Sequence, residues 1–186
     1  MGIPTLIKTL TASDSASLEF VDGTDDVVLD GTYDEYMFVC TDINPATDMT
    51  EFGFQVNATD DPGGDYDTSL ITSTFIHTYQ DEADSDAAVM YHTSHDQAQG
   101  AALQELVYDV GNGSDESAAG TLHLFNPSST TYVKHFYARF QGYQGSNFAF
   151  DNYAAGYIND TTAIDDIRFK FSSGNFDGTI KMYGLL

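Results

Sequence analysis

Polar and apolar residues alternate with a period of two in several short stretches of the chain. The clearest stretches are residues 17–21, 52–56, 121–125, 167–171 and 179–183. Aromatic and β-branched side chains supply most of the apolar positions, a combination that is typical of β-strands with one buried face. Residues 133–140 continue the pattern over a longer run, in which basic residues stand among aromatic ones. We therefore expect a chain made mainly of half-buried strands.

Turn-forming pairs separate these stretches, and helix-like sequence is rare. Asp-Gly, Asn-Pro and Asn-Gly pairs lie between the strand-like runs, and each favours a tight turn. Only residues 96–109, where alanine and leucine gather, have the composition of a short helix. Strands that do not alternate with helices favour antiparallel sheets. The sequence thus predicts an all-β, antiparallel β-sandwich of jelly-roll type with at most one short helix, as a single domain over residues 1–186.

The apolar positions of these strands are the candidates for the core or for a subunit interface. They are Phe20, Phe38, Phe54, Phe125, Phe136, Phe140, Phe169, Phe171 and Met182. Because neighbouring residues of a strand point to opposite faces, Phe169 and Phe171 should be buried together, with Arg168 and Lys170 on the other side. The one cysteine, Cys40, lies in an apolar run and is expected to be a small buried side chain.

Charge is distributed unevenly along the chain. The sequence has 29 acidic and 6 basic residues, and there is no lysine or arginine between Lys8 and Lys134. Only five acidic residues follow Lys134, so the other 24 lie in residues 9–133. So negative a surface repels nucleic acid and anionic membranes. We expect salt to stabilise the protein by screening this repulsion.

The C-terminal quarter, residues 134–186, is nearly neutral and rich in phenylalanine and tyrosine, which makes it the candidate for contacts between subunits. The candidate interface residues are Lys134, Phe136, Arg139, Phe140, Arg168, Lys170 and Tyr183. At least two of its basic residues Lys134, Arg139, Arg168 and Lys170 are expected to meet carboxylates of residues 9–133 or of a neighbouring subunit. Closed homo-oligomers are the common arrangement for such subunits.

The sequence also disfavours a membrane-spanning protein and a secreted protein. None of its apolar runs approaches the roughly 18 residues of a membrane-spanning helix. Residues 1–8 lack the basic and apolar regions of a signal peptide. We expect a protein that is made and assembled inside a cell.

His92, His95 and Asp96, with Ser94 between them, form the densest group of residues of catalytic type. Neither a His-Glu-x-x-His pair nor a nucleophile elbow accompanies them, and the sequence supplies no third zinc ligand at a recognisable spacing. We therefore expect a polar loop beside the short helix, and neither a catalytic nor a cofactor-binding residue.

Four carboxylates, Asp60, Asp61, Asp65 and Asp67, gather in a glycine-rich turn. Calcium prefers several carboxylate and carbonyl oxygens on a flexible loop, but the spacing here differs from that of an EF-hand. A solvated hairpin tip is the expected structure, with Ca²⁺ binding by these four residues as the alternative. No other cofactor is expected.

Three parts of the sequence are more specific than the overall composition. They are residues 32–39 with 43–48, residues 124–136, and residues 164–176 with 178–184. Together they resemble a family of small virion proteins encoded by tailed bacteriophages, notably phages of marine bacteria and cyanobacteria. The resemblance covers nearly the whole chain from Leu6 onward. Its most specific part is the last strand, which follows a glycine turn and ends in Tyr183-Gly184. The resemblance implies a structural, non-enzymatic β protein of the particle, and it transfers no catalytic residue.

Two functional hypotheses follow. The first is a non-enzymatic virion structural protein on the particle surface, either a capsid decoration or cement protein or a short appendage or fibre subunit. Such a protein would be assembled in the host cytoplasm, form homo-oligomers and contact other virion proteins such as the major capsid protein, with neither nucleic acid nor a membrane as partner. The second is a receptor- or glycan-binding module of a phage tail, or a free lectin, with a host surface glycan as ligand. A glycan hydrolase is a third, less favoured hypothesis.

Overall fold

The fold is built from β-strands. The structure is a computed structural model, and it describes residues 3–61, 66 and 68–186. Its strands are β1 (Thr5–Ser15), β2 (Leu18–Val21), β3 (Glu35–Pro45), β4 (Thr50–Ala58), β5 (Ile71–Asp81), β6 (Ala87–Tyr91), β7 (Ala98–Gly100), β8 (Gln104–Val110), β9 (Ala118–Phe125), β10 (Lys134–Gln144), β11 (Phe148–Ile158), β12 (Ile164–Phe171) and β13 (Phe176–Leu185). These strands pair antiparallel, which confirms the expected all-β, antiparallel class. The described residues contain no helix long and apolar enough to cross a membrane.

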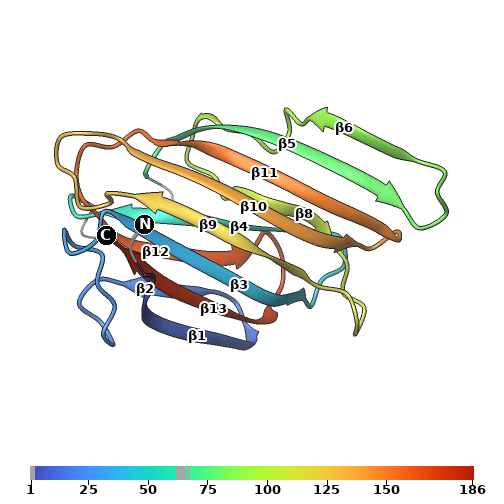
Figure 1. The fold of residues 1–186 in the computed structure, drawn as a ribbon, viewed down its shortest axis with the longest axis horizontal. Coiled ribbons are helices and arrows are strands. Elements are labelled where there is room, and N and C mark those ends of the chain that lie inside the picture. Colours follow the sequence, from blue (N-terminus) through green and yellow to red (C-terminus); the bar gives the residue numbers. More distant parts are fainter. Residues whose placement is uncertain (1–2, 62–65, 67) are drawn as a thin grey trace.

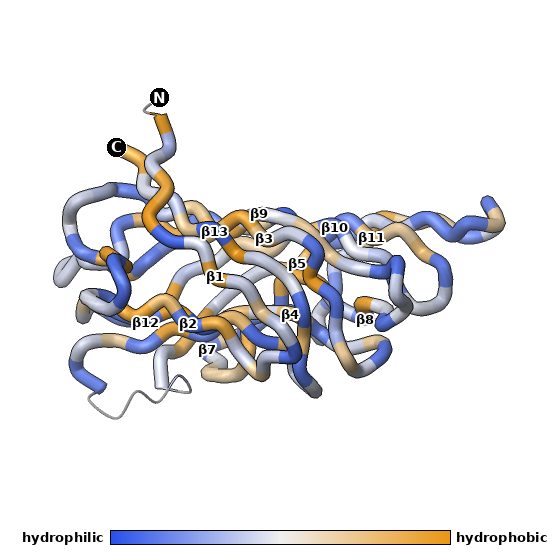
Figure 2. The backbone as a smooth tube through the Cα atoms, turned by 90° about the horizontal axis from the view of Figure 1, so that it is seen from below, coloured by the Kyte–Doolittle hydropathy of each residue, from blue (hydrophilic) through white to orange (hydrophobic). Residues whose placement is uncertain are grey.

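Eight of the strands form the two facing sheets of a jelly roll. One sheet has the order β1-β13-β3-β9, the other has the order β8-β4-β12-β2, and the pairing of Gln144 on β10 with Val110 on β8 connects them at one edge. Neighbours within a sheet come from distant parts of the sequence, and consecutive strands such as β3 and β4 lie in opposite sheets, as the two Greek keys of a jelly roll require. Figure 2 shows the two sheets edge-on as an upper and a lower layer. The jelly-roll type expected from the sequence is therefore confirmed.

Two insertions widen the first sheet. β10 and β11 follow β9 in the chain, and β5, β6 and β7 lie between β4 and β8. β10 pairs with β9 and β11, β11 pairs with β5, and β5 pairs with β6 and β7. The result is one large sheet that runs from β1 to β6, and in Figure 1 these strands follow one another from β6 at the top to β1 at the bottom.

The expectation of a short helix at residues 96–109 is wrong. This segment contains β7 and β8, joined by residues 101–103. Both faces of β8 are covered, so five of its seven residues are buried. A strand that is buried on both faces carries apolar residues side by side, and the period of two that marks a half-buried strand is lost.

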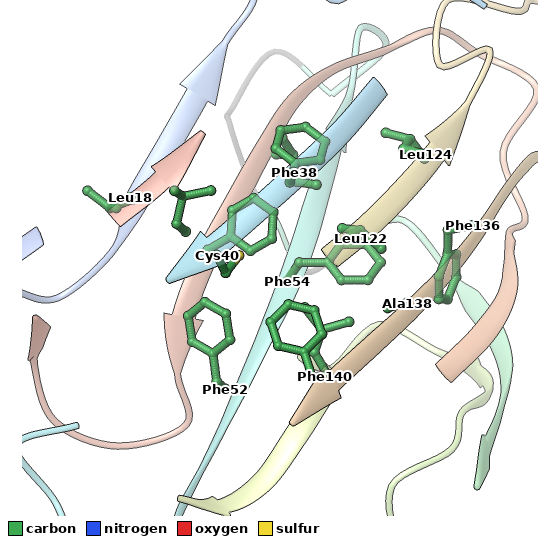
Figure 3. Close-up of a cluster of buried hydrophobic side chains, with 14 of the residues drawn as sticks. Leu18, Phe38, Cys40, Phe52, Phe54, Leu122, Leu124, Phe136, Ala138 and Phe140 are labelled. Atoms are coloured by element: carbon green, nitrogen blue, oxygen red, sulfur yellow. The ribbon is translucent and has the colours of Figure 1, made fainter. Parts of the chain in front are cut away.

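Phenylalanine rings fill the space between the two sheets. The Phe169 ring on β12 lies 5.3 Å from the ring of Phe38 on β3 and stacks on Phe52 of β4 at 6.1 Å. Phe54 on β4 meets Phe136 on β10 edge to face at 5.1 Å. Figure 3 shows rings from both sheets, among them Phe38, Phe52, Phe54 and Phe136, meeting in this space. The core therefore joins the two layers through aromatic contacts.

The predicted core agrees closely with the observed one. Of the nine residues proposed for the core or an interface, all but Phe125 are buried. Phe169 and Phe171 are buried together, and Arg168 and Lys170, which alternate with them, lie on the opposite face of β12, as predicted. Cys40 is buried as expected, and burial raises the pKa of its thiol. Phe125 is half-buried and lies on the other side of the sheet.

The outward face of β4 is also covered, by the chain between β7 and β8. Gln55 on this face is buried and donates from Nε2 to the carbonyl oxygen of Ala101 at 3.4 Å. At Gly53, an added Cβ would lie 2.3 Å from the carbonyl oxygen of Gln104. Only glycine allows the two backbones to approach so closely.

Replacing Gly53 by alanine is expected to lower the free energy of unfolding by about 1–3 kcal/mol, because the new methyl group would overlap the backbone of Gln104. Urea unfolding followed by circular dichroism measures the change. Gly31→Ala is the control, since its added Cβ would meet only the hydroxyl of Ser128, at 3.7 Å. A loss of equal size in both variants would contradict the close approach.

Candidate interaction face

The large sheet has a face that points away from the core. Along β10, Phe136 and Phe140 point inward, whereas Tyr137 and Arg139 between them are exposed. The same alternation exposes Tyr153 on β11. We call the surface made by the outward side chains of β9, β10, β11, β5 and β6 the outer face.

One row of outward residues crosses four strands of the outer face. Arg139 on β10 lies opposite Tyr153 on β11, and Tyr153 lies opposite Ile76 on β5. Ile76 in turn lies opposite Tyr91 on β6. Tyr153, Ile76 and Tyr91 are 42%, 43% and 50% exposed. Since opposite residues on paired strands are in contact, these side chains form a continuous apolar strip instead of scattered surface residues.

Arg139 is held in place at one end of this row. Its Nε and Nη2 donate to the two carboxylate oxygens of Asp151, at 3.0 and 2.9 Å. Its guanidinium carbon lies 5.2 Å from the centre of the Tyr153 ring, and the hydroxyl of Tyr153 donates to Asp151 at 3.2 Å. A two-pronged ion pair with a stacked ring fixes the planar group, so this part of the outer face is preformed.

A second aromatic group lies on β9 and β10. The ring of Tyr137 stacks on His123 with centroids 4.5 Å apart, and Phe125 lies 5.7 Å from Tyr137. Nδ1 of His123 contacts the carboxylate of Glu35 on β3. Phe125, which was predicted for the core or an interface, therefore supports an exposed tyrosine of the outer face.

The outer face is hollowed at the end near the turn between β5 and β6. The hollow has a volume of about 770 Å³, and small side chains such as Ala119 and Ala149 form part of its floor. Its lining also includes Thr78, Tyr79, Gln80, Asp81, Glu82, Ser117, Gln141, Gly142, Tyr143, Phe148, Phe150 and Asp151. The hydroxyl oxygen of Tyr143 lies within hydrogen-bonding distance of the side chains of Glu82, at 3.0 Å, and Asn147, at 2.9 Å. The hollow thus combines aromatic rings with amide, hydroxyl and carboxylate groups.

A cluster of histidines lies on the inner side of β5. The buried ring of His77 is 5.1 Å from that of Tyr108 on β8 and 5.2 Å from that of His92, and His77 Nδ1 contacts the Tyr108 hydroxyl. His92 and His95 lie 4.1 Å apart. His95 stacks on Tyr108 at 4.3 Å, and its Nδ1 contacts the carboxylate of Glu105. We call these five residues the histidine cluster.

The histidine cluster corrects the expectation of a polar loop beside a helix. His92 and His95 are half-buried and pack against a core tyrosine. Their partners His77, Glu105 and Tyr108 lie on other strands and show no spacing pattern with them. The sequence therefore pointed to His92 and His95 but gave no signal for their three partners.

The surroundings of the cluster disfavour positive charge on His77 and His92. Burial, and then the charges of His92 and His95, lower the pKa of His77 to about 4. Burial also lowers the pKa of His92 and raises the pKa of the nearby Asp109 carboxyl group. At neutral pH, His77 and His92 are therefore uncharged, and they can pack as aromatic rings.

Three of the predicted interface residues are not on the surface, which corrects that prediction. Lys134, Phe136 and Phe140 are buried inside the chain. The ammonium group of Lys134 donates to the carbonyl oxygen of Asp160 at 3.1 Å and to that of Thr162. Burial lowers the pKa of this lysine. The two carbonyl groups take the place of water, so the side chain can be buried.

The other four predicted interface residues keep some exposure. Arg139 lies on the outer face, as described above. Arg168 donates to the side-chain oxygen of Gln55 at 2.7 Å, and its guanidinium carbon lies 4.2 Å from the centre of the Tyr66 ring. Lys170 and Tyr183 are half-buried.

Neither Arg139 nor Arg168 forms the expected ion pair with a carboxylate of residues 9–133. Arg139 pairs with Asp151, which lies in the C-terminal quarter itself. Arg168 bonds to an uncharged amide. Pairing with a neighbouring subunit stays a prediction.

The acidic turn proposed as an alternative calcium site is described only in part. Asp60 is exposed, and the carboxylate of Asp61 accepts a hydrogen bond from the hydroxyl of Thr68 at 2.7 Å. Asp65 and Asp67 lie outside the described residues. Within the described part of the chain, no three His, Cys, Asp or Glu side chains converge as a metal site. Calcium binding by these four residues stays a prediction.

Comparison with known proteins assigns no family. No protein-family model matches the chain, and no curated protein matches it.

Proposed function

We propose that this protein is a non-enzymatic structural subunit on the surface of a bacteriophage particle, either a capsid decoration or cement protein or a short appendage or fibre subunit. The observation that carries the proposal is the outer face, where a hydrogen-bonded sheet presents Tyr153, Ile76 and Tyr91 in one exposed row. The jelly roll, an architecture of viral capsid and lectin domains, supports it. The resemblance of the sequence to small virion proteins supports it further.

The composition of the outer face fits a protein contact. Interfaces are enriched in tyrosine and arginine, and their strongest contacts are aromatic or arginine side chains that are already held in place. Arg139 and Tyr153 meet this description because their mutual contact and Asp151 fix them before any partner arrives. A partner such as the major capsid protein would cover the strip and remove its apolar surface from water.

Quantitative mass spectrometry of purified particles tests the proposal. A copy number near that of the major capsid protein would indicate decoration, and a few copies per particle would indicate an appendage. Absence of the protein from purified particles would contradict both forms of the proposal. Tyr153→Ser should reduce incorporation into particles, whereas Tyr132→Ser, at a site that is 71% exposed outside the row, should leave incorporation unchanged.

Glycan binding is the second candidate function, and the hollow of the outer face favours it. Sugar rings stack on aromatic side chains and exchange hydrogen bonds with amides, hydroxyls and carboxylates. Tyr143, Gln80, Gln141 and Asp151 offer these groups around a single hollow. A glycan array would detect a ligand. Gln141→Ala should weaken its binding, whereas Thr41→Ala, on the same sheet but outside the hollow, should not.

A further inference from the structure

β6 is a free edge of the large sheet. It pairs with β5 on one side, and no other strand pairs with it among the described residues. Figure 1 shows it as the outermost strand of the sheet, at the upper right. A free edge offers unpaired backbone groups to any strand that can approach it.

The hydrogen bonds to β5 show which groups of β6 are free. The N–H of His92 donates to the carbonyl oxygen of Phe75 at 2.9 Å. In an antiparallel pair, hydrogen-bonded positions alternate with positions that face outward. Ala87, Val89 and Tyr91 therefore direct their N–H and C=O groups away from β5. Three successive outward positions provide up to six hydrogen bonds to a new strand.

The two ends of the large sheet differ in how they are protected. β1, at the opposite end, carries Lys8 and Asp14, and its pairing with β13 has two register shifts. Charges and bulges of this kind block the addition of another strand. β6 has neither a charged residue nor proline, and its register with β5 has no shift. Val89, in its middle, is 74% exposed. The protection found at β1 is thus missing at β6.

We propose that two copies of this chain form a symmetric dimer in which their β6 strands pair antiparallel, with Val89 opposite Val89 of the second copy. This register gives full overlap of the strand and places Ala87 of each copy opposite Tyr91 of the other. All three outward positions of both strands are then hydrogen-bonded. The inference rests on the proposed structural role, and it specifies the contact between two copies of the subunit.

Charge favours the antiparallel arrangement with a second copy. The turn between β5 and β6 carries Asp81, Glu82, Asp84 and Asp86. Five residues separate Asp84 from Val89, or roughly 17 Å of strand, so the two acidic turns lie roughly 34 Å apart across the symmetry axis. This separation exceeds the Debye length of about 8 Å at physiological salt. The turns therefore do not repel each other strongly.

The same register also matches opposite groups at the two ends of the pairing. One step beyond Ala87, Asp86 of one copy lies opposite His92 of the other. A carboxylate can accept a hydrogen bond from the ring N–H of an uncharged imidazole, which is the form of His92 at neutral pH. On the outer face, the row that contains Tyr153, Ile76 and Tyr91 continues onto Ala87 of the second copy. The dimer therefore extends the apolar strip across both subunits.

Sedimentation velocity across the micromolar range tests the dimer. The wild-type protein should dimerise reversibly. Val89→Lys places two like charges opposite each other at the symmetry axis, and it should raise the dissociation constant roughly tenfold or more. Val89→Thr, which keeps the shape and the backbone bonds, should still dimerise. A wild-type protein that stays monomeric, or a Val89→Lys variant that dimerises as well as wild type, would overturn the proposal.

Cross-linking tests the register independently of affinity. Ala88 of one copy and Met90 of the other form a pair that is not hydrogen-bonded, with Cα atoms about 4.5 Å apart, which suits a disulfide. A mixture of the Ala88→Cys and Met90→Cys variants should form a mixed disulfide dimer under mild oxidation, whereas neither variant alone should. Cys40 is buried, so its thiol should not form disulfides in this experiment.

The cross-link separates this inference from the proposed function. A disulfide between two Ala88→Cys chains, or none in the mixture, would overturn the proposed pairing whether or not the protein is found on particles. Conversely, a dimer with the predicted cross-link that is absent from purified particles would keep the pairing and overturn the virion role.

Discussion

Replacing Phe169 by alanine is expected to lower the free energy of unfolding by about 3–5 kcal/mol. The Phe169 ring is fully buried and lies 5.3–6.5 Å from the rings of four other phenylalanines, namely Phe20, Phe38, Phe52 and Phe54. These neighbours come from β2, β3 and β4, and therefore from both sheets. Because the hydrogen-bonded sheets cannot move independently into the vacated space, the substitution leaves a cavity as well as losing buried apolar surface.

Urea unfolding followed by far-ultraviolet circular dichroism measures this loss. Phe169→Leu keeps more of the ring's volume and should lose less stability than Phe169→Ala. Tyr132→Ala, at an exposed aromatic position, should change the free energy of unfolding by no more than about 0.5 kcal/mol. A loss below about 1 kcal/mol for Phe169→Ala would show that the core between the two sheets is less tightly packed than described.

The strands that form the two sides of the sandwich could be predicted because each buries one face. At β12, the alternation of Phe169 and Phe171 with Arg168 and Lys170 determines which residues face the core, and the structure follows it. The turn-forming pairs between such strands, together with the lack of helical periodicity, were enough to predict an antiparallel sandwich of jelly-roll type.

Prediction failed where tertiary contacts cover both faces of a strand or satisfy an unusual residue. β8 was expected to be helical because alanine and leucine gather in residues 96–109, but its adjacent Leu106 and Val107 are both buried, on opposite faces of a strand. Lys134 was expected at an interface because it lies in the nearly neutral, aromatic C-terminal quarter, but it is buried inside the chain. Two carbonyl groups, of Asp160 and Thr162, accept its hydrogen bonds, and they come from a segment that the sequence does not link to it.

The outer face and the histidine cluster depend on pairings between inserted strands. Tyr153 and Ile76 become neighbours only because β11 pairs with β5. His77 and Tyr108 meet only because β5 extends over β8. No local rule of sequence gives the order of β10, β11, β5 and β6 in a sheet, so the aromatic residues could be assigned to strands but not to a common surface.

Acidification from about pH 6.5 to about pH 4 is expected to destabilise the protein through His77, on the order of 2–3 kcal/mol. The pKa of His77 is lowered to about 4, below the ordinary value of 6.5, by burial and by the charges of His92 and His95. The unfolded chain therefore binds a proton at this residue at a higher pH than the folded chain does. The contribution of His77 to the free energy of unfolding is fully present above pH 6.5. It is lost as the pH falls towards 4 and changes little at lower pH.

Other groups around the cluster modify this profile, so a variant is needed to isolate His77. His92 acts in the same sense, because burial lowers its pKa too. Asp109 acts in the opposite sense, because burial raises the pKa of its carboxyl group and the folded state then holds a proton more tightly than the unfolded state. Glu105 contacts His95 directly, and Tyr108 contacts His77. The measured quantity is therefore the difference in pH dependence between wild type and variant.

His77→Gln provides this difference, since an amide can bond to the Tyr108 hydroxyl but does not titrate in this range. The variant should be less stable than wild type at pH 8 through lost packing, yet its free energy of unfolding should fall less between pH 6.5 and 4. His135→Gln, on the outer face beside Tyr157, should keep the wild-type slope. Urea unfolding at a series of pH values measures all three proteins. Parallel profiles for wild type and His77→Gln would mean that protonation of the buried imidazole does not cause the loss of stability between pH 6.5 and 4.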